Sequence, residues 1–447
     1  MEIIGFLSNL VKIDSSINPS VNQFPDARAR NYTKNVAVEL DFSILELPDC
    51  TYPGTDAEIF PLVAYKRSET PGKTVLFLGH LDVVPVPEGE TWDYPPFSGA
   101  VEGDRLYGRG ASDMKGGDVA FFKAFEGPLK SGTVVIALSG DEEVGGHGSM
   151  PVIVESLKQA NLLPDYVINA EPSRNNIIVT QRRGGTWITY SFERKKSTAV
   201  GKIETMEFKA VQSNGSQTLH SSAFVLGADI HPFIAAAKFC VNKPVIEVVS
   251  SSIKENAVPE IVTVKYIDDS VDGEVHEYDL SLSRVMTAVA SIGSLHLPIV
   301  PSKFGSSICP NILKIGDDIQ LTIDIRAMLK SSNSHEEMAK LIMQSFDNVG
   351  QVGSYDISAA IDPVYVDPKS HLPQRLKVIA EECGMKIIDI GEKLGGASDT
   401  RYFTSLGIPG VELGPEGKNE HGPNEYVSIS SIERLVTIFK RIYEDLQ

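Results

Sequence analysis

Five residues that can bind a metal ion are spread along this chain, close to short apolar runs that are typical of buried strands. His80 follows TVLFLG, Glu143 follows TVVIALSGDE, and Glu171 follows YVINA. Asp113 lies in GRGASDMKGG, and His421 follows GVELGPEGKNE. In an open parallel sheet, the loops that leave the carboxyl ends of the strands converge on one crevice. We therefore expect these five side chains to share a single site.

The chemistry of this set favours two metal ions. Carboxylate oxygens and imidazole nitrogens without a thiolate suit zinc, with cobalt or manganese as alternatives. Two histidines and three carboxylates are too many ligands for one tetrahedral ion, whereas two ions bridged by one carboxylate would use the whole set. The pattern therefore predicts a hydrolase with two divalent metal ions.

Length and charge exclude several other classes of protein. A chain of 447 residues exceeds the usual size of one hydrophobic core, so two domains are expected. The formal net charge of -18 opposes binding to nucleic acid and to anionic membranes. No run approaches the roughly 18 apolar residues of a membrane span, and the first residues lack the features of a signal peptide. The 4 cysteines are widely spaced and form no CxxC pair, which indicates a cytoplasmic location.

The first part of the chain has an α/β pattern. Apolar runs rich in β-branched residues predict buried parallel strands at 75–78, 134–138 and 167–168. Helical spacing of apolar residues predicts helices at 3–11, 118–125 and 152–159. The same pattern returns near residue 367, with a helix at 371–384, a strand at GVEL and a terminal helix from residue 430. The expected fold class is α/β with a mostly parallel sheet.

Between these two parts the pattern changes. Strand-like patterns occur in TWITYSFERK, KIETMEFKAV, VIEVVS, EIVTVKYI and IQLTIDIRAM, and KSSNSHEE is typical of a loop. An α+β domain at residues 179–362 is therefore predicted to be inserted into a catalytic domain made of residues 1–178 and 363–447.

Six successive motifs resemble the co-catalytic zinc family that includes acetylornithine deacetylase, succinyl-diaminopimelate desuccinylase, aminoacylases and glutamate carboxypeptidases. The similarity spans most of the chain, and the order of the motifs is more specific than any one of them. They are GHLDVVP from Gly79, LYGRGASDMKGG from Leu106, SGDEEVGGHGS from Ser139, NAEPS from Asn169, GGASDTRYF from Gly395, and ELGP with His421. This resemblance implies a zinc-exopeptidase-like catalytic domain with an inserted dimerisation or lid domain.

The resemblance also implies a role for each metal ligand. Asp113 would bridge two ions, one also held by His80 and Glu171, and the other by Glu143 and His421. Asp82 would support His80, because the second nitrogen of a metal-bound imidazole is usually held by a carboxylate or a carbonyl. Glu142 would act as general base and activate the water that bridges the metals.

In the inserted domain, the resemblance implies a homodimer in which His220 of QTLHSS reaches the scissile carbonyl from the other subunit. Asn311 and Arg326 lie where the family places groups that hold the substrate, and Arg326 is suited to a bidentate grip on a carboxylate. Gly396 in GGASD would allow close approach of the backbone to the substrate.

The expected activity is hydrolysis of the amide bond of small N-acyl amino acids. A carboxypeptidase or dipeptidase that acts on short peptides is the alternative, because it uses the same chemistry. A metal-holding binding protein without turnover is a third interpretation, and the retention of Glu142 argues against it. The chain has no GxSxG, GxxxxGK[ST] or HExxH motif, which argues against a serine hydrolase, an ATPase and a zincin.

Overall fold

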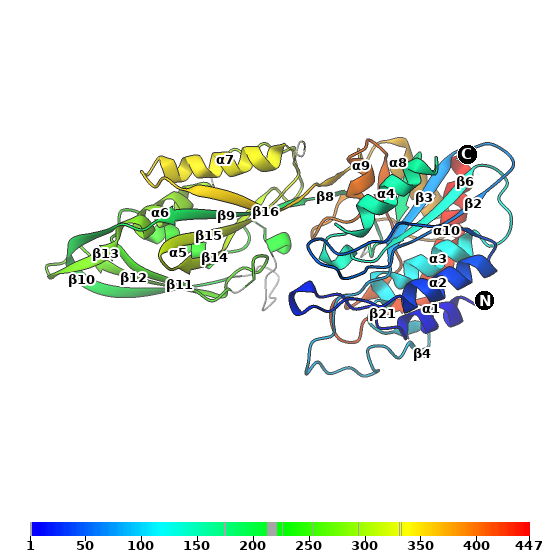
Figure 1. Ribbon diagram of the computed structural model, residues 1–447, viewed down its shortest axis with the longest axis horizontal. Helices are drawn as coiled ribbons and strands as arrows, with labels where there is room; N and C mark the ends of the chain where they lie inside the picture. Colours follow the sequence, from blue (N-terminus) through cyan, green and yellow to red (C-terminus); the bar gives the residue numbers. More distant parts are fainter. Residues whose placement is uncertain are drawn as a thin grey trace. The chain divides into compact units, whose positions relative to one another are not determined.

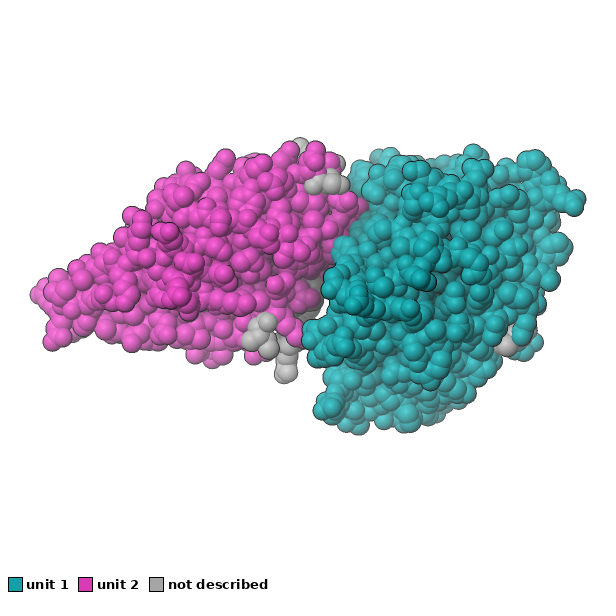
Figure 2. Space-filling view, in the orientation of Figure 1, with its two compact units in different colours: residues 1–181, 364–393, 398–447 teal, residues 182–363, 394–397 magenta. Residues whose placement is uncertain are grey.

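The computed structural model describes residues 2–173, 176–211, 221–225, 227–252, 254–293, 295–329, 331 and 333–447. The chain divides into two compact units, which Figure 2 colours separately. The first unit comprises residues 1–181, 364–393 and 398–447, and the second comprises residues 182–363 and 394–397. Among the described residues, no helix is long and apolar enough to cross a membrane.

The first unit is built on a mixed sheet, in which nine strands are found among the described residues, in the order β1-β2-β6-β3-β7-β19-β8-β17 with β18 beside β8. The central strands are parallel neighbours: β6 (Thr133–Ser139), β3 (Thr74–His80), β7 (Tyr166–Asn169) and β19 (Gly410–Glu412). The outer strands are β1 (Ser43–Leu45), β2 (Leu62–Arg67), β8 (Ile177–Arg182), β17 (Val364–Tyr365) and β18 (Asp389–Glu392). The predicted α/β class with mostly parallel central strands is confirmed.

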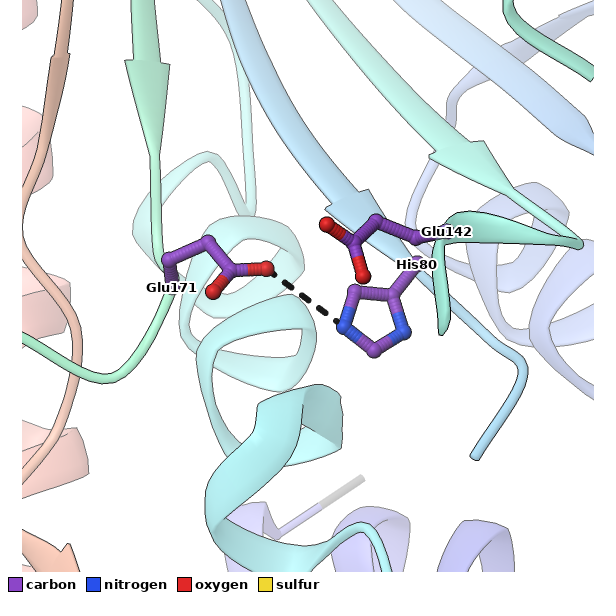
Figure 3. Close-up of side chains that lie close together, drawn as sticks. All are labelled: His80, Glu142 and Glu171. Atoms are coloured by element: carbon purple, nitrogen blue, oxygen red, sulfur yellow. Dashed lines mark ion pairs between the residues drawn. The ribbon is translucent and has the colours of Figure 1, made fainter. Parts of the chain in front are cut away.

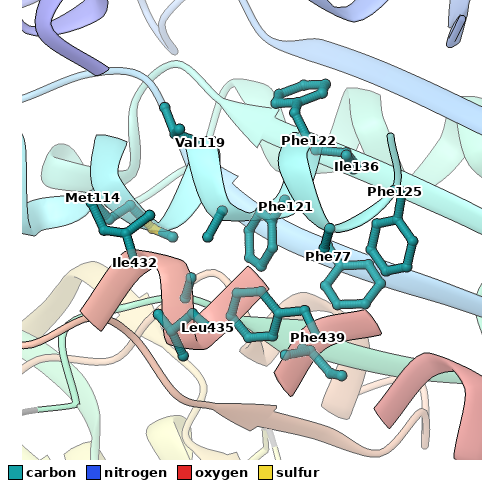
Figure 4. Packing of buried hydrophobic residues seen from close by; sticks show 14 of the residues in the cluster. Phe77, Met114, Val119, Phe121, Phe122, Phe125, Ile136, Ile432, Leu435 and Phe439 are labelled. Atoms are coloured by element: carbon teal, nitrogen blue, oxygen red, sulfur yellow. The ribbon is translucent and has the colours of Figure 1, made fainter. Parts of the chain in front are cut away.

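Helices pack on both faces of this sheet, as the side chains of β3 show. Val75 and Phe77 belong to one apolar core, whereas the alternate residues Leu76 and Leu78 belong to another on the opposite face. Figure 4 shows Phe77 in the larger core, packed with aromatic rings of α3 and α10. The helices of this unit are α1 (Ile3–Val11), α2 (Arg28–Glu39), α3 (Gly116–Ala124), α4 (Ser149–Gln159), α8 (His371–Glu382), α9 (Arg401–Thr404) and α10 (Ile429–Asp445).

A small antiparallel sheet joins two distant segments of the first unit. Its strands are β4 (Ala100–Glu102), β5 (Arg105–Tyr107), β20 (Gly417–Lys418) and β21 (Tyr426–Ser428). The order is β20-β21-β5-β4, so the centre of the sheet pairs the chain before α3 with the chain before α10.

The second unit contains two antiparallel sheets, each with four strands in the described residues (Figure 1). One has the order β11 (Val245–Ser250), β12 (Ile261–Asp268), β10 (Lys196–Lys209) and β13 (Glu274–Asp279). The other has the order β14 (Ser307–Ile315), β15 (Asp318–Ala327), β9 (Gly184–Glu193) and β16 (Ser354–Ile361). The helices α5 (Pro232–Phe239), α6 (Leu280–Ile292) and α7 (Ser334–Asp347) share one apolar core with strands of both sheets.

One local prediction is wrong in this unit. The segment KSSNSHEE was expected to be a loop, but α7 begins within it at Ser334. Glu336 and Glu337 lie in the first turn, where negative charge complements the positive end of the helix dipole. Met338 and Ile342 then bury one side of the helix in the core of the unit.

Candidate active site

The ends of three strands in the first unit carry four of the predicted site residues. β3 ends at His80, the loop after β6 carries Glu142 and Glu143, and Glu171 lies just beyond β7. Because β6, β3 and β7 are parallel neighbours, their carboxyl ends lie at one edge of the sheet. Figure 3 shows the side chains of Glu142 and Glu171 beside the His80 ring.

Two further segments contribute Asp113 and His421. Asp113 lies in a short irregular turn, Ala111–Lys115, between β5 and α3. His421 lies in the loop between β20 and β21 and has a φ of 64°. Since β5 pairs with β21, the small sheet holds these two segments side by side.

Asp113 lies between the two histidines. Its Oδ1 is 3.3 Å from Nε2 of His80, and its Oδ2 is 3.3 Å from Nε2 of His421. Each histidine has a second carboxylate partner. Oε1 of Glu171 is 3.6 Å from Nε2 of His80, and Oε2 of Glu143 is 3.1 Å from Nε2 of His421. The five predicted ligands therefore form two groups that share the Asp113 carboxylate.

The cluster as a whole suits divalent metal ions, because overlapping sets of its ligand atoms lie close together. Ligand atoms of His80, Glu142 and Glu171 lie within 4.8 Å of one another, as do those of His80, Asp113 and Glu143. Oε1 of Glu143 is buried and has no hydrogen-bond partner in the described part of the chain. Burying such an oxygen is costly unless a donor or a cation satisfies it. Imidazole nitrogens and carboxylate oxygens without a thiolate are a suitable donor set for two such ions.

Burial and mutual charge shift the pKa values of this cluster. Burial, together with the negative charge of Glu171, raises the pKa of Glu142 well above its usual value. The carboxylate of Glu143, together with Asp113, raises the pKa of His421 to about 11. Protons therefore neutralise part of the acidic cluster when no metal is bound, and metal binding has to release them.

Asp82 connects the strand end of β3 to the loop that carries the two glutamates. Nδ1 of His80 lies 2.9 Å from the Asp82 carbonyl oxygen, so a proton on Nδ1 donates there and leaves Nε2 available for a metal. The Asp82 carboxylate accepts hydrogen bonds from the backbone amides of Glu142 at 3.1 Å and Glu143 at 3.0 Å. The carbonyl and the carboxylate of one buried residue thus contact three site residues.

Two residues predicted to contact substrate, Asn311 and Gly396, belong to the second unit. His220, which was predicted to reach the scissile carbonyl, lies outside the described residues. Asn311 is buried in the second unit, where its Nδ2 donates to Oγ of Ser221 at 2.8 Å. The carbonyl of Gly396 accepts a hydrogen bond of 3.2 Å from Nη1 of Arg182.

Arg326 is also buried in the second unit. Its Nε and Nη2 donate to the two oxygens of Asp324 at 2.7 and 3.1 Å. The guanidinium lies over the ring of Trp187, 4.3 Å from its centroid. The side chain therefore already makes a bidentate carboxylate contact of the kind expected for substrate.

Two acidic residues near the metal cluster have no role in the sequence-based prediction. The carboxylate of Asp141 accepts hydrogen bonds from the amides of Gly148 at 2.7 Å and Ser149 at 3.1 Å, and so closes the loop that carries the glutamates. Glu425 is fully buried and lies four positions after His421. Asp141 stands inside the SGDEEVGGHGS motif, two positions before Glu143, and this position is a signal that could have pointed to it. Glu425 lies outside the quoted motifs, and no local pattern in the sequence points to it.

Comparison with known proteins gives the family. Residues 76–445 match the model of peptidase family M20/M25/M40. The chain belongs to this family. Succinyl-diaminopimelate desuccinylase from Nitratiruptor is 24% identical over 375 residues, which cover 83% of this chain and 84% of the relative. The enzyme of the same name from Helicobacter pylori is 26% identical over 374 residues, with coverages of 83% and 79%.

Solved structures of M20 proteins share the fold. Aminoacylhistidine dipeptidase from Vibrio alginolyticus superposes with a TM-score of 0.74 at 15% identity, covering 99% of this chain and 96% of that one. A metallo-carboxypeptidase from Sulfolobus solfataricus gives a TM-score of 0.61 at 18% identity, with coverages of 99% and 98%. As a member of family M20/M25/M40, the chain is a metal-dependent hydrolase that acts on amide bonds.

Proposed function

We propose that this hydrolase cleaves the amide bond of N-acyl amino acids, as acetylornithine deacetylases and succinyl-diaminopimelate desuccinylases do. The observation that carries the proposal is the position of Asp113 between two histidine–carboxylate pairs. The desuccinylase relatives, which align with 83% of the chain, support an acylated amino acid as the substrate.

Each ion would have its own ligands and would share Asp113. His80 and Glu171 would hold one ion, and Glu143 and His421 would hold the other. When bound, two divalent ions lower the pKa of water and polarise the carbonyl of the scissile amide. We propose zinc because the donors are nitrogen and oxygen atoms, with cobalt and manganese as the ions to compare in reconstitution.

Glu142 would carry out the proton transfers. Its carboxylate lies in the same cluster as those of the metal ligands, and Asp82 holds its backbone amide. The Glu142 carboxylate accepts a proton from water as the oxygen attacks the carbonyl carbon. It then gives this proton to the nitrogen as the C–N bond breaks, which releases a carboxylate and a free amine.

The proposal also assigns residues of the second unit to contacts with the substrate. We assign Arg326, Asn311 and Gly396 to substrate binding, and His220 to stabilisation of the oxyanion, from the resemblance of their segments to motifs of the family. Arg326→Lys keeps the charge and removes the planar fork, so it is expected to raise KM more than it changes kcat. An unchanged KM would remove Arg326 from the substrate site.

A cytoplasmic homodimer completes the proposal. Exposed apolar side chains on paired strands support an interface: Val200 on β10 and Val275 on β13 are neighbours, and they are 55% and 68% exposed. The 4 widely spaced cysteines, which are free thiols in this structure, support a reducing compartment. Analytical ultracentrifugation at micromolar concentration tests the dimer, and a fully active monomer would exclude it.

The experiment that tests the activity is a substrate panel. Zinc-loaded protein is incubated with N-succinyl and N-acetyl amino acids and with short peptides, and the released amine is measured with and without a chelator. Chelator-sensitive release from acyl amino acids is the expected result. Preferential cleavage of peptides would favour the carboxypeptidase or dipeptidase alternative, and no release from any compound would favour the binding protein without turnover.

A further inference from the structure

Glu425 is an acidic residue that the proposed mechanism does not use. Its side chain is 0% exposed, and its two carboxylate oxygens meet three backbone amides of the turn that carries Asp113. Oε2 accepts a hydrogen bond from the amide of Gly110 at 3.1 Å. Oε1 accepts from the amides of Ser112 at 3.0 Å and Asp113 at 3.1 Å. One carboxylate therefore binds the backbone of this turn on both sides of residue 111.

Arg109 and the backbone reinforce this connection. Nη1 of Arg109 donates to Oε2 of Glu425 at 2.7 Å and to the carbonyl of Gly422 at 3.3 Å. The amide of Gly108 donates to the carbonyl of Glu425 at 2.9 Å. The loop that contains His421 and the turn that contains Asp113 are therefore joined through both main chain and side chains.

An ion pair with Arg109 alone does not account for the position of Glu425. Arg109 contacts Oε2, whereas Oε1 faces the amides of Ser112 and Asp113. Asp113 has φ -119° and ψ 93°, which is not helical. Its backbone amide therefore lies outside the regular hydrogen-bond pattern of a helix. A buried carboxylate that accepts hydrogen bonds from several such amides stabilises one backbone conformation of the turn.

We propose that Glu425 is a positioning residue that holds the Asp113 backbone, so that the Asp113 carboxylate stands between His80 and His421 before any metal binds. This inference rests on the ligand assignment in the proposed function. Because Asp113 serves both ions, loss of the Glu425 contacts weakens the binding of both. Loss of a ligand that serves one ion, such as Glu171, weakens mainly that ion.

The test compares metal affinity in Glu425→Gln and in wild-type protein, by competition for zinc with a chromophoric chelator. The expected result is about 10–100-fold weaker binding of both ions, as is typical when a group that orients metal ligands is lost. Hydrolysis is expected to recover to within a few-fold of wild type at saturating zinc. Glu416→Gln is the matched control, because Glu416 makes an exposed ion pair with Arg434 at 3.0 Å. If folded Glu425→Gln binds zinc as tightly as wild type, the proposal is overturned, even if the melting temperature of the variant is lower.

Glu425→Gln leaves the buried charge of Arg109 without its anionic partner, which could destabilise the fold. A second variant therefore separates loss of the backbone contacts from loss of the ion pair. The double variant Arg109→Met/Glu425→Gln removes that charge and is expected to show the same loss of affinity for both ions.

Hydrogen exchange of the metal-free wild-type protein gives a third readout. Protection of the amides of Gly110, Ser112 and Asp113 before zinc is added is expected, and free exchange of these amides overturns the proposal. None of these measurements needs a substrate, so a failure of the proposed activity would be seen separately.

Discussion

The carboxylate of Asp82 accepts a hydrogen bond of 3.1 Å from the backbone amide of Glu142, the proposed general base. Its other oxygen accepts from the next amide along the chain at 3.0 Å. The Asp82 carbonyl also lies 2.9 Å from Nδ1 of His80. The orientation of a metal ligand and the orientation of the base therefore depend on the same buried residue.

Asp82→Asn tests this dependence. The substitution keeps the size of the side chain but replaces one acceptor oxygen by a donor, so one of the two backbone amides loses its partner. We expect zinc affinity to fall about 10–100-fold. Equilibrium dialysis against zinc measures the change, and Asp56→Asn, at an exposed position, serves as the control. Equal affinities in the two variants would show that Asp82 does not support the site.

Glu142→Ala separates metal binding from catalysis. Glu142 is not among the five assigned ligands, so both ions are expected to remain bound. Loss of the base is expected to lower kcat by at least about 10²-fold. Steady-state kinetics and metal analysis of the same samples check this, with the exposed Glu155→Ala on α4 as the control. Unchanged turnover would remove Glu142 from the mechanism.

Phe439→Ala tests the core beneath the site. The Phe439 ring lies 5.0 Å from that of Phe121 and 5.7 Å from that of Phe77, and the side chain is fully buried (Figure 4). Its removal is expected to lower the free energy of unfolding of the first unit by about 3–5 kcal/mol. Urea denaturation followed by circular dichroism measures the loss. Val378→Ala, at a position 40% exposed on α8, is expected to change it by less than about 1 kcal/mol.

We expect His231 to make the stability of the second unit depend on pH. Burial lowers the pKa of His231 to about 4, and its Nε2 lies 3.2 Å from Oδ1 of Asn311. An unfolded histidine titrates near pH 6.5, so between about pH 6.5 and 4 the unfolded chain binds a proton that the folded chain does not. Stability contributed by the neutral ring is therefore present above this window and is lost as pH falls, at roughly 1.4 kcal/mol per pH unit.

The measurement is urea denaturation of wild type and His231→Asn at several values of pH from 7 to 4. The variant is expected to show a shallower loss of stability on acidification than wild type. Parallel slopes for wild type and His231→Asn would contradict this account.

The sheet edge that carries the site could be predicted from sequence. A strand buried on both faces needs a continuous apolar run, and β3, β6 and β7 have such runs. Polar residues at the ends of these runs, such as His80, are expected at the strand ends, where a metal ion or a hydrogen-bond partner can satisfy them. The order of the motifs then indicated the family, which the match over residues 76–445 confirms.

The start of α7 and the role of Glu425 could not be predicted, because they depend on contacts between residues far apart in the sequence. The start of α7 lies in a polar stretch, and what stabilises the helix is the packing of Met338 and Ile342 on distant strands. The role of Glu425 depends on backbone amides, which have no sequence signature, and its contact with Ser112 spans 313 positions. Long-range pairing of β5 with β21 creates that contact.

The most direct test of the account is a zinc titration of metal-free protein, in which bound zinc and hydrolysis of an N-succinyl amino acid are measured in the same samples. Two zinc ions per chain are expected in the wild type, with amine release that rises as they bind and is abolished by a chelator. Asp113→Ala is expected to weaken the binding of both ions, whereas Glu171→Ala is expected to weaken mainly the binding of one. Saturation at a single ion, or amine release that persists in chelator, would contradict the two-metal site.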